Sequence, residues 1–276
     1  MTEDTQVPPI ETGWWPTTPA GDTYLRRFLL NWAGMCAAAA HSVGGNGRDL
    51  PAVLMADSGR PVVFFNCATL TQPLLAETAS ATLDEIAAFF AFADPSGQGE
   101  VLLVSAWPTG DLRPLGWSLM GHPPLFLLPA GSVSRTAPTD LRIEEVRDLE
   151  ALHAWERVVI EGYPVDTLAG SPPGSLFSES WLEEPCSRLW VGWFGDRPVS
   201  ASSSWTEFGI NDVTLVATIP DARGHGYGEA LTWCAALADS SLPAMLISSD
   251  IGRPVYERMG FLPLQRITLW YRSRPS

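Results

Sequence analysis

Apolar positions in the second half of this 276-residue chain recur with two different periods. Leu152, Trp155, Val159 and Ile160 follow one another at helical spacing, which predicts a helix over residues 149–161. Short apolar runs bounded by turn residues predict strands at 141–146, 189–194, 199–205, 213–219, 244–248 and 267–271. Further helices are predicted at 176–182, 226–238 and 254–259. The order β-α-α-β-β-β-α-β-α-β predicts an α/β (α+β) fold, with helices flanking a mixed, mostly antiparallel sheet.

A stretch rich in Pro, Gly, Ser and Thr separates this half from the first half of the chain. It reads PAGSVSRTAPTD, from Pro129 to Asp140, and this composition is typical of a linker. We therefore predict two domains, over residues 1–130 and 141–276, joined by a linker at 131–140.

Two pairs of short segments indicate that the halves are copies of one another. WSLMGHPPL at 117–125 matches YERMGFLPL at 256–264, and SGRPVV at 58–63 matches GDRPVS at 195–200, at nearly equal offsets. The alternative is that these are common fragments in a chain rich in Arg and Pro. We favour a duplication, and expect the first copy to be degenerate.

The composition argues against two classes of partner. The net charge is −14, and all 17 basic residues are arginine, with no basic run. Phosphate neutralisation and attraction to an anionic membrane both need clustered cations, so we expect neither nucleic acid nor membrane as a partner. The acidic N-terminus MTEDTQVPPIETGWW lacks the apolar core of a signal peptide, and no apolar run is long enough to span a bilayer. We expect a cytoplasmic protein.

The cysteine and histidine residues show no metal-ligand spacing. No CxxC pair occurs among Cys36, Cys67, Cys186 and Cys234, so these are expected to be reduced thiols. We predict no bound metal.

A glycine-rich segment follows the strand predicted at 213–219 and opens the next helix. It reads Arg223-Gly224-His225-Gly226-Tyr227-Gly228. Backbone N–H groups at a helix start lack intrahelical partners, and the helix dipole adds positive charge, so glycines there favour close approach of a phosphate. The alternative is a glycine-rich turn that merely packs tightly. The pattern alone predicts a phosphate-bearing ligand and no particular reaction.

Together with Gly252-Arg253-Pro254-Val255-Tyr256-Glu257-Arg258-Met259-Gly260-Phe261, this segment resembles the GNAT superfamily of acetyl-CoA-dependent N-acetyltransferases. The resemblance lies in the R/Q-x-x-G-x-G/A signature and the Tyr-x-x-x-Gly-Phe ending, and it covers about residues 141–274. The first half is similar only through its element order and the segment repeat described above. The resemblance thus implies two tandem GNAT-like domains, the first without the glycine loop, because Pro61 to Ser96 contains no glycine.

The resemblance also implies roles for individual residues. The backbone of the glycine segment would bind the coenzyme A pyrophosphate, and the strand edge at Val216, Ala217 and Thr218 would pair with the pantetheine arm and polarise the thioester carbonyl. Tyr256 would protonate the leaving thiolate, the alternative being a core-facing aromatic. The segment repeat aligns Trp117 with Tyr256, and an indole cannot serve as the acid. Positions that depart from many family members are His225 in the loop and the run Ser248-Ser249-Asp250, where Ser249 is expected beside the cofactor.

The general base and the acceptor are less defined. An acceptor amine must lose a proton before it attacks, and Glu207 and Asp212, at neighbouring strand ends, are the candidate bases. Six acids between Glu156 and Glu184 would favour a small-molecule or peptide amine, possibly cationic, although an acidic surface on an acidic protein is an equal explanation.

The sequence therefore favours acetyl transfer to a primary amine by direct attack. A non-catalytic acyl-CoA-binding or sensing protein is the alternative. The oligomeric state, the acyl length and the identity of the amine are not determined by the sequence.

Overall fold

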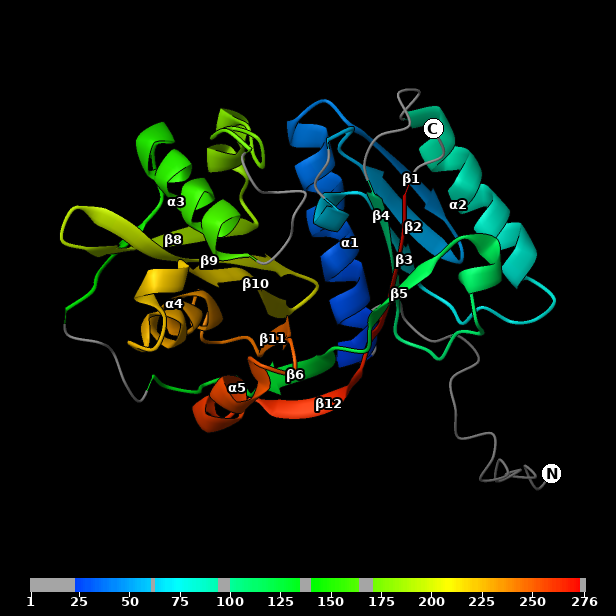
Figure 1. Ribbon diagram of the computed structural model, residues 1–276. Helices are drawn as coiled ribbons and strands as arrows, with labels where there is room; N and C mark the ends of the chain where they lie inside the picture. Colours follow the sequence, from blue (N-terminus) through cyan, green and yellow to red (C-terminus); the bar gives the residue numbers. More distant parts are fainter. Residues whose placement is uncertain (1–22, 61–62, 94–99, 135–139, 164–170, 274–276) are drawn as a thin grey trace, which may run out of the picture.

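The computed structural model describes residues 23–60, 63–93, 100–134, 140–163 and 171–273, which form two β-sheets with helices around them (Figure 1). The first sheet has six strands in the order β1-β2-β3-β4-β13-β5. Its strands are β1 (Asn46–Leu50), β2 (Val53–Asp57), β3 (Cys67–Leu70), β4 (Glu100–Ser105), β13 (Thr268–Ser273) and β5 (Ser118–Gly121).

The second sheet has seven strands in the order β12-β6-β11-β10-β9-β8-β7. Its strands are β12 (Leu262–Arg266), β6 (Pro124–Leu128), β11 (Ala244–Ile247), β10 (Ile210–Thr218), β9 (Arg197–Glu207), β8 (Ser187–Phe194) and β7 (Arg142–Glu145). One pair in each sheet is parallel, β3 with β4 and β10 with β11, and the remaining pairs are antiparallel. The mixed, mostly antiparallel sheets of the predicted fold class are therefore confirmed.

The α-helices of the described residues are α1 (Tyr24–Ser42), α2 (Ala79–Ala93), α3 (Leu149–Gly162), α4 (Tyr227–Ala236) and α5 (Arg253–Met259). In the second half, α3, α4 and α5 lie where the sequence predicts helices. Asp148 caps α3 by accepting a hydrogen bond from the Ala151 N–H at 2.8 Å, and the apolar stripe that predicted this helix is buried, with Leu152 and Trp155 fully covered. The helix predicted at 176–182 is a short 3-10 turn, Glu179–Glu183.

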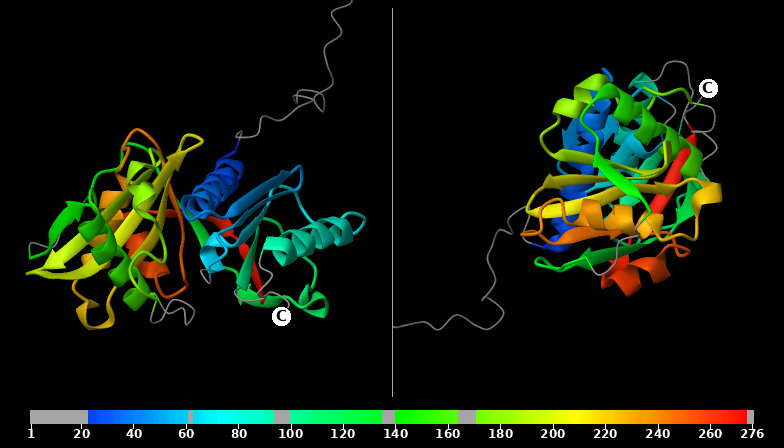
Figure 2. Two further views of the ribbon diagram at one scale, coloured as in Figure 1. Left: turned by 90° about the horizontal axis from the view of Figure 1, so that it is seen from above. Right: turned by 90° about the vertical axis from the view of Figure 1, so that its left-hand side faces the viewer.

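Helix α1 lies between the two sheets and contacts both (Figures 1 and 2). On one side, the Trp32 indole N–H contacts the Cys67 sulfur on β3 at 3.3 Å. On the other side, the buried Asn31 amide donates to the backbone carbonyls of Trp205 and Glu207 at the end of β9, at 3.3 and 3.1 Å. Asn31, a polar interruption in an apolar run, thus ties the first half to the second sheet.

The two halves exchange one strand each. Strand β6 comes from the first half but pairs with β11 and β12 in the second sheet, and β13 comes from the C-terminal end but pairs with β4 and β5 in the first sheet. The predicted division at 131–140 therefore does not coincide with the boundary between the sheets. Residues 135–139 of that predicted linker lie outside the described residues.

The halves share one topology, but the segment pairs that suggested a duplication do not occupy equivalent places. In each sheet a hairpin leads to a third strand, a helix crosses over, and a parallel strand follows: β1-β2-β3-α2-β4 and β8-β9-β10-α4-β11. Trp117, however, directly precedes β5, whereas Tyr256 lies in α5. Ser58 follows β2, whereas its matched residue Gly195 precedes β9. The alignment of Trp117 with Tyr256 was therefore wrong, because similar fragments fell in different elements.

Candidate functional site between the sheets

Strand β10 carries an irregularity that opens the second sheet. Its pairing with β9 is interrupted between Thr214 and Ala217, and Leu215 has a φ of 48°, in the left-handed region that side chains rarely adopt. Its pairing with β11 is confined to Asn211 and Asp212. Beyond Asp212 the backbone of β10 therefore has a free edge on the side of β11, available to a ligand.

A cavity of about 600 Å³ lies at this opening. The second half contributes residues from β10, the end of α3, the segment after β11 and α5, including Tyr163, Asp212, Val216, Ser249 and Tyr256. The first half contributes residues from α1, from the 3-10 turn Val63–Phe65 and from strands β4 and β5. The structure thus brings Val216, Ser249 and Tyr256 to one cavity and adds a wall from the first half.

The glycine segment lies where β10 leads into α4, as predicted. Gly224 and Gly226 have φ values of 84° and 79°, so these positions favour glycine. No side chain caps α4, and Gly226 itself stands at its N-cap. Gly224, His225 and Gly226 are exposed. The segment is therefore a solvent-facing cradle of backbone amides at a helix start, a geometry that fits an anionic ligand.

The side chains of this segment hold the loop in place. The Arg223 guanidinium donates to the backbone carbonyls of Thr218 and Gly162, at 3.1 and 2.9 Å. Tyr227 is buried and donates to Asp140 at 3.1 Å. Arg223 thus links the loop to β10 and to the C-terminal end of α3. A ligand at this loop would meet the backbone rather than these side chains.

Helix α3 packs tightly against the end of β10, where the glycine loop begins. A Cβ added to Gly162 would lie 3.0 Å from the Ala217 side chain and 3.2 Å from the Thr218 backbone. Ala217 is buried, and Ser200 on β9 donates to its carbonyl at 2.9 Å while also contacting the Thr218 hydroxyl at 2.8 Å. The end of β10 is therefore held from β9 and from α3, and its β11 side is left open.

Tyr256 lies in α5, packed between two aromatic rings and facing the cavity. Its ring centroid is 6.3 Å from that of Phe126 and 5.8 Å from that of Phe261. Burial raises the pKa of the phenol, and the Thr232 hydroxyl offsets part of this shift. The phenol therefore stays protonated at neutral pH. The Tyr256 ring thus packs against two core aromatic residues and also borders the cavity. The two alternatives for this residue, a core aromatic or a cavity residue, therefore do not exclude one another.

Tyr163, which the sequence patterns did not single out, is a second phenol in the cavity. It follows α3, and its ring packs edge-on against Phe64 of the first half at 5.8 Å. Burial, and to a lesser extent the proximity of Tyr256, raise the pKa of this phenol. The two tyrosines thus line the same cavity.

Asp212 and Glu207, the two candidate bases, differ sharply in environment. Asp212 lines the cavity, is 1% exposed, and neither of its carboxylate oxygens has a hydrogen-bond partner among the described residues. Burial raises the pKa of this carboxyl well above its usual value. Glu207 is not among the described residues that line the cavity, and its carboxylate accepts from the Trp205 indole at 3.2 Å. Of the two carboxylates, Asp212 is thus the one that lines the cavity.

The acidic rim expected between Glu156 and Glu184 is smaller than the sequence suggested. Glu156 is fully buried, and its carboxylate accepts hydrogen bonds from the backbone N–H groups of Gly174, Leu176 and Phe177. It fixes a loop and does not face solvent. Asp166, another member of the set, lies outside the described residues.

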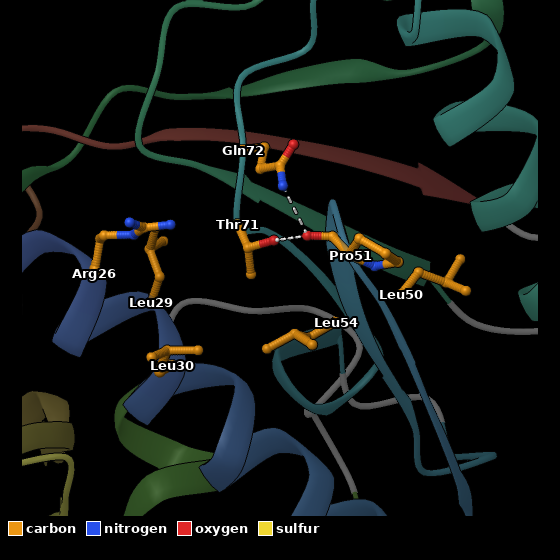
Figure 3. A pocket seen from close by; sticks show the side chains of 8 residues that line it. All are labelled: Arg26, Leu29, Leu30, Leu50, Pro51, Leu54, Thr71 and Gln72. Carbon is orange, nitrogen blue, oxygen red and sulfur yellow. Dashed lines mark hydrogen bonds between the residues drawn. The ribbon is translucent and has the colours of Figure 1, made fainter. Parts of the chain in front are cut away.

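The first half has no equivalent of the glycine loop. The segment between β3 and α2 begins with Thr71 and Gln72, whose side chains both donate to the Pro51 carbonyl, at 2.9 and 3.2 Å (Figure 3). These two residues border a smaller cavity of about 240 Å³ that also contacts α1 and the β1-β2 hairpin. Their polar groups are turned toward the protein's own backbone, consistent with a first half that lacks a phosphate cradle.

Within the described ranges, His, Cys, Asp and Glu side chains do not gather in groups of three or more that could hold a metal ion. None of the helices described combines the length and apolar character needed to cross a bilayer. The four cysteines are free thiols.

No protein-family model and no curated protein matches the chain. Solved structures do match. A GCN5-related N-acetyltransferase from Kribbella flavida is 18% identical with a TM-score of 0.59, over 88% of this chain and 95% of that one. A conserved protein of unknown function from Staphylococcus epidermidis is 12% identical with a TM-score of 0.61, over 84% and 96%. A GCN5-related N-acetyltransferase-like protein from Streptococcus suis is 12% identical with a TM-score of 0.53, over 89% and 100%.

Each of these alignments spans more than four fifths of the chain, so each extends over both sheets. At such low identity the likeness concerns the fold. The chain has a GNAT-like fold, and the resemblance first seen in two short motifs is confirmed at this level.

Proposed function

We propose that this protein is an acyltransferase that moves an acetyl group from acetyl-CoA to a primary amine. One observation carries the proposal: a single cavity joins the irregular edge of β10, the protonated phenol of Tyr256 and the buried carboxyl of Asp212, which has no hydrogen-bond partner within the described part of the chain. The exposed glycine cradle lies at the end of the same strand. The GNAT-like fold supports acyl transfer as the general class.

The residues present fit coenzyme A. The backbone of Arg223-Gly224-His225-Gly226-Tyr227-Gly228 offers amides to a pyrophosphate, and the open edge of β10 at Val216, Ala217 and Thr218 can pair with the amides of a pantetheine arm. Ser249 borders the cavity after β11. When bound, acetyl-CoA supplies an acetyl group activated as a thioester.

Asp212 is suited to receive a proton from the acceptor. A primary ammonium with a pKa of about 10 must be deprotonated before its nitrogen can attack. A carboxyl whose pKa is raised by burial is a stronger base than an ordinary aspartate once ionised, and it lies in the cavity without a competing partner. Asp212 would take this proton directly or through one water molecule.

Two further groups would stabilise the negative charges that develop during the reaction. The Val216 backbone would act on the thioester oxygen, and the Tyr256 phenol on the departing sulfur. Val216 lies where the β9 pairing is irregular, between Thr214 and Ala217, and it borders the cavity, so its N–H would donate to the thioester oxygen as negative charge develops there. The new C–N bond forms and the C–S bond breaks, and Tyr256 gives its proton to the departing sulfur. The resulting phenolate takes the second proton that the nitrogen loses as it becomes an amide, while the first proton passes from Asp212 to solvent.

The test is to incubate the protein with acetyl-CoA and each of a panel of primary amines. Acetyl transfer is measured as release of the free coenzyme A thiol. We expect turnover with at least one amine, and a kcat/KM that falls as pH decreases through the raised pKa of Asp212. Asp212→Asn should lower kcat/KM by about 10²-fold or more, the usual contribution of a general base. Glu207→Gln is the matched control and should retain most of the activity.

Two results would contradict the proposal in different ways. Binding of acetyl-CoA without transfer to any amine would leave a non-catalytic acyl-CoA-binding protein. Transfer that survives Asp212→Asn but is lost in Glu207→Gln would place the base at the other carboxylate.

A further inference from the structure

We propose that the first half of the chain selects the acceptor, and that this acceptor is a small primary amine with an apolar body and no anionic group. The inference rests on the proposed function, since it concerns the amine that occupies the same cavity. It assigns the first half a part in substrate selection, although that half has no glycine cradle.

The wall that the first half contributes is almost entirely apolar. Its apolar side chains come from α1, the 3-10 turn, β4 and β5, namely Trp32, Met35, Phe64, Phe65, Leu102 and Met120, and Gly121, His122 and Pro123 complete it. Aromatic rings, a flexible thioether and branched carbons suit an aromatic or branched hydrocarbon body. Such a wall offers few hydrogen bonds to a polyhydroxylated ligand.

Helix α1, which forms part of this wall, contacts β10, the strand that carries Asp212. The Thr214 hydroxyl on β10 lies 3.7 Å from the Met35 sulfur of α1. The Asn31 amide of the same helix is hydrogen-bonded to the carbonyls of Trp205 and Glu207. An apolar body against α1 would thus place its amino group toward the part of β10 that carries Asp212.

The charges around the cavity favour a cation and disfavour an anion. Among the described residues that line it, the acids are Asp212 and Asp250, and neither Lys nor Arg is present. Asp250 is already paired with Arg266 at 2.9 Å, so Asp212 is the acid left without a partner. His122 also borders the cavity, and its ring nitrogen contacts the Thr268 hydroxyl at 3.2 Å. A carboxylate on the acceptor would therefore find no guanidinium or ammonium partner in this lining, and burying it would be unfavourable.

The volume limits the size of the acceptor. The cavity measures about 600 Å³ and must hold the acyl end of the donor as well as the amine. This is within the range of ordinary small-molecule sites. A free small amine fits these dimensions.

The experiment compares acetylation of three amines. One of the two comparison amines adds a carboxylate to the reference amine, and the other replaces its apolar body with a second amino group. The probes are 2-phenylethylamine, phenylalanine (the same body with a carboxylate) and 1,4-diaminobutane (a second cation with no bulky body). We expect kcat/KM for 2-phenylethylamine to exceed that for either of the others by about 100-fold, the size expected when one buried charge is unpaired.

A pair of neighbouring variants tests whether the first half sets this preference. Met120 borders the cavity and is 43% exposed, and the adjacent Leu119 is 44% exposed but is not among the cavity residues. Met120→Arg should reduce the preference for 2-phenylethylamine over phenylalanine at least tenfold, and Leu119→Arg should leave the ratio unchanged.

Three readouts separate the two proposals. If acetyl is transferred but phenylalanine or the diamine is preferred, or if both variants shift the ratio equally, the acceptor inference is overturned while the proposed function stands. If no amine is acetylated, thermal stabilisation of the protein by 2-phenylethylamine alone, lost in Met120→Arg and kept in Leu119→Arg, would still support the amine site. Absence of both transfer and stabilisation would contradict the inference.

Discussion

Asp212 is buried at a cost to the folded state. Its carboxyl is covered from water and has no hydrogen-bond partner among the described residues, so its charged form is disfavoured. Proteins retain such groups mainly where they serve a ligand or a reaction. A substrate ammonium would supply the missing partner.

This burial predicts a pH-dependent change in stability. Because the folded-state pKa of Asp212 is raised, the folded protein holds a proton that the unfolded chain has already released, and stability is lost as pH rises through the folded pKa. Asp212→Asn removes the titration, so the variant should be more stable than the native protein at pH 8, and this advantage should shrink at pH 5. Urea unfolding at both pH values measures the difference. A variant that is less stable at pH 8 would show that the ionised carboxyl is compensated after all.

A second prediction at the scale of residues concerns kcat in variants of the two cavity tyrosines, Tyr256 and Tyr163. Tyr256→Phe should lower kcat by about 10²-fold or more, because a general acid is lost. The affinity for acetyl-CoA should stay nearly the same, since the ring still packs against Phe126 and Phe261. Tyr163→Phe is the matched control and should have the smaller effect on kcat. Equal losses in both variants would remove the assignment of the acid to Tyr256.

The sequence predicted some of these residues for identifiable reasons. Tyr256, Val216 and Ser249 follow from the resemblance to the GNAT superfamily that two short motifs carry, and the structure brings them to one cavity. Asp212 and Glu207 could not be separated, because both stand at strand ends and the pattern gives no information on which is buried. Tyr163 was missed because nothing in its local sequence reveals that α3 ends at the cavity that Tyr256 lines.

At the scale of elements, the position of the glycine loop at the start of α4 predicts how Gly224→Ala changes the affinity for acetyl-CoA. Gly224 has a positive φ, and an added Cβ there would meet no atom within 4 Å, so Gly224→Ala acts through backbone strain alone. We expect acetyl-CoA affinity to fall about fivefold to tenfold, which corresponds to a strain of about 1 kcal/mol. Calorimetric titration of the variant measures this.

Gly195 provides the matched control for that variant. It also has a positive φ and open space around its Cβ position, but it lies in the turn between β8 and β9. Gly195→Ala should destabilise the protein by a similar amount without changing acetyl-CoA affinity. A loss of affinity in both variants would mean that the effect is one of global stability.

Two features of the strands could not be predicted from the sequence. Strand β12 was missed because it contains Pro263 and its leucines are exposed, which is unusual for a strand except at a sheet edge, where β12 lies. The irregularity at Leu215 and Val216 was also missed, since the run VTLVATI reads as one continuous apolar strand. Both depend on neighbours that are distant in sequence.

At the scale of the whole molecule, the exchanged strands make the two halves interdependent. Strand β6 is fully buried in the second sheet, and it connects β11 to β12. Strand β13 connects β4 to β5 in the first sheet. Local sequence patterns identify strands but not their partners, which explains why the predicted boundary and the sheets disagree.

This exchange predicts that neither half folds alone. A fragment of residues 141–276 lacks β6, and a fragment of residues 1–130 lacks β13, so each would leave apolar strand edges unpaired. We expect no cooperative unfolding transition from either fragment, measured by circular dichroism. The two fragments produced together should copurify and show one transition. A sharp transition from residues 141–276 alone would contradict this account.

The central claim is that one acyl-CoA site exists, formed by the second sheet and completed by the first half. Calorimetric titration of the intact chain with acetyl-CoA tests it most directly. The account predicts one site per chain, with weaker binding in Gly224→Ala. Two sites per chain would show that the first half retains its own cradle, and no binding at millimolar acetyl-CoA would contradict the proposed transferase function altogether.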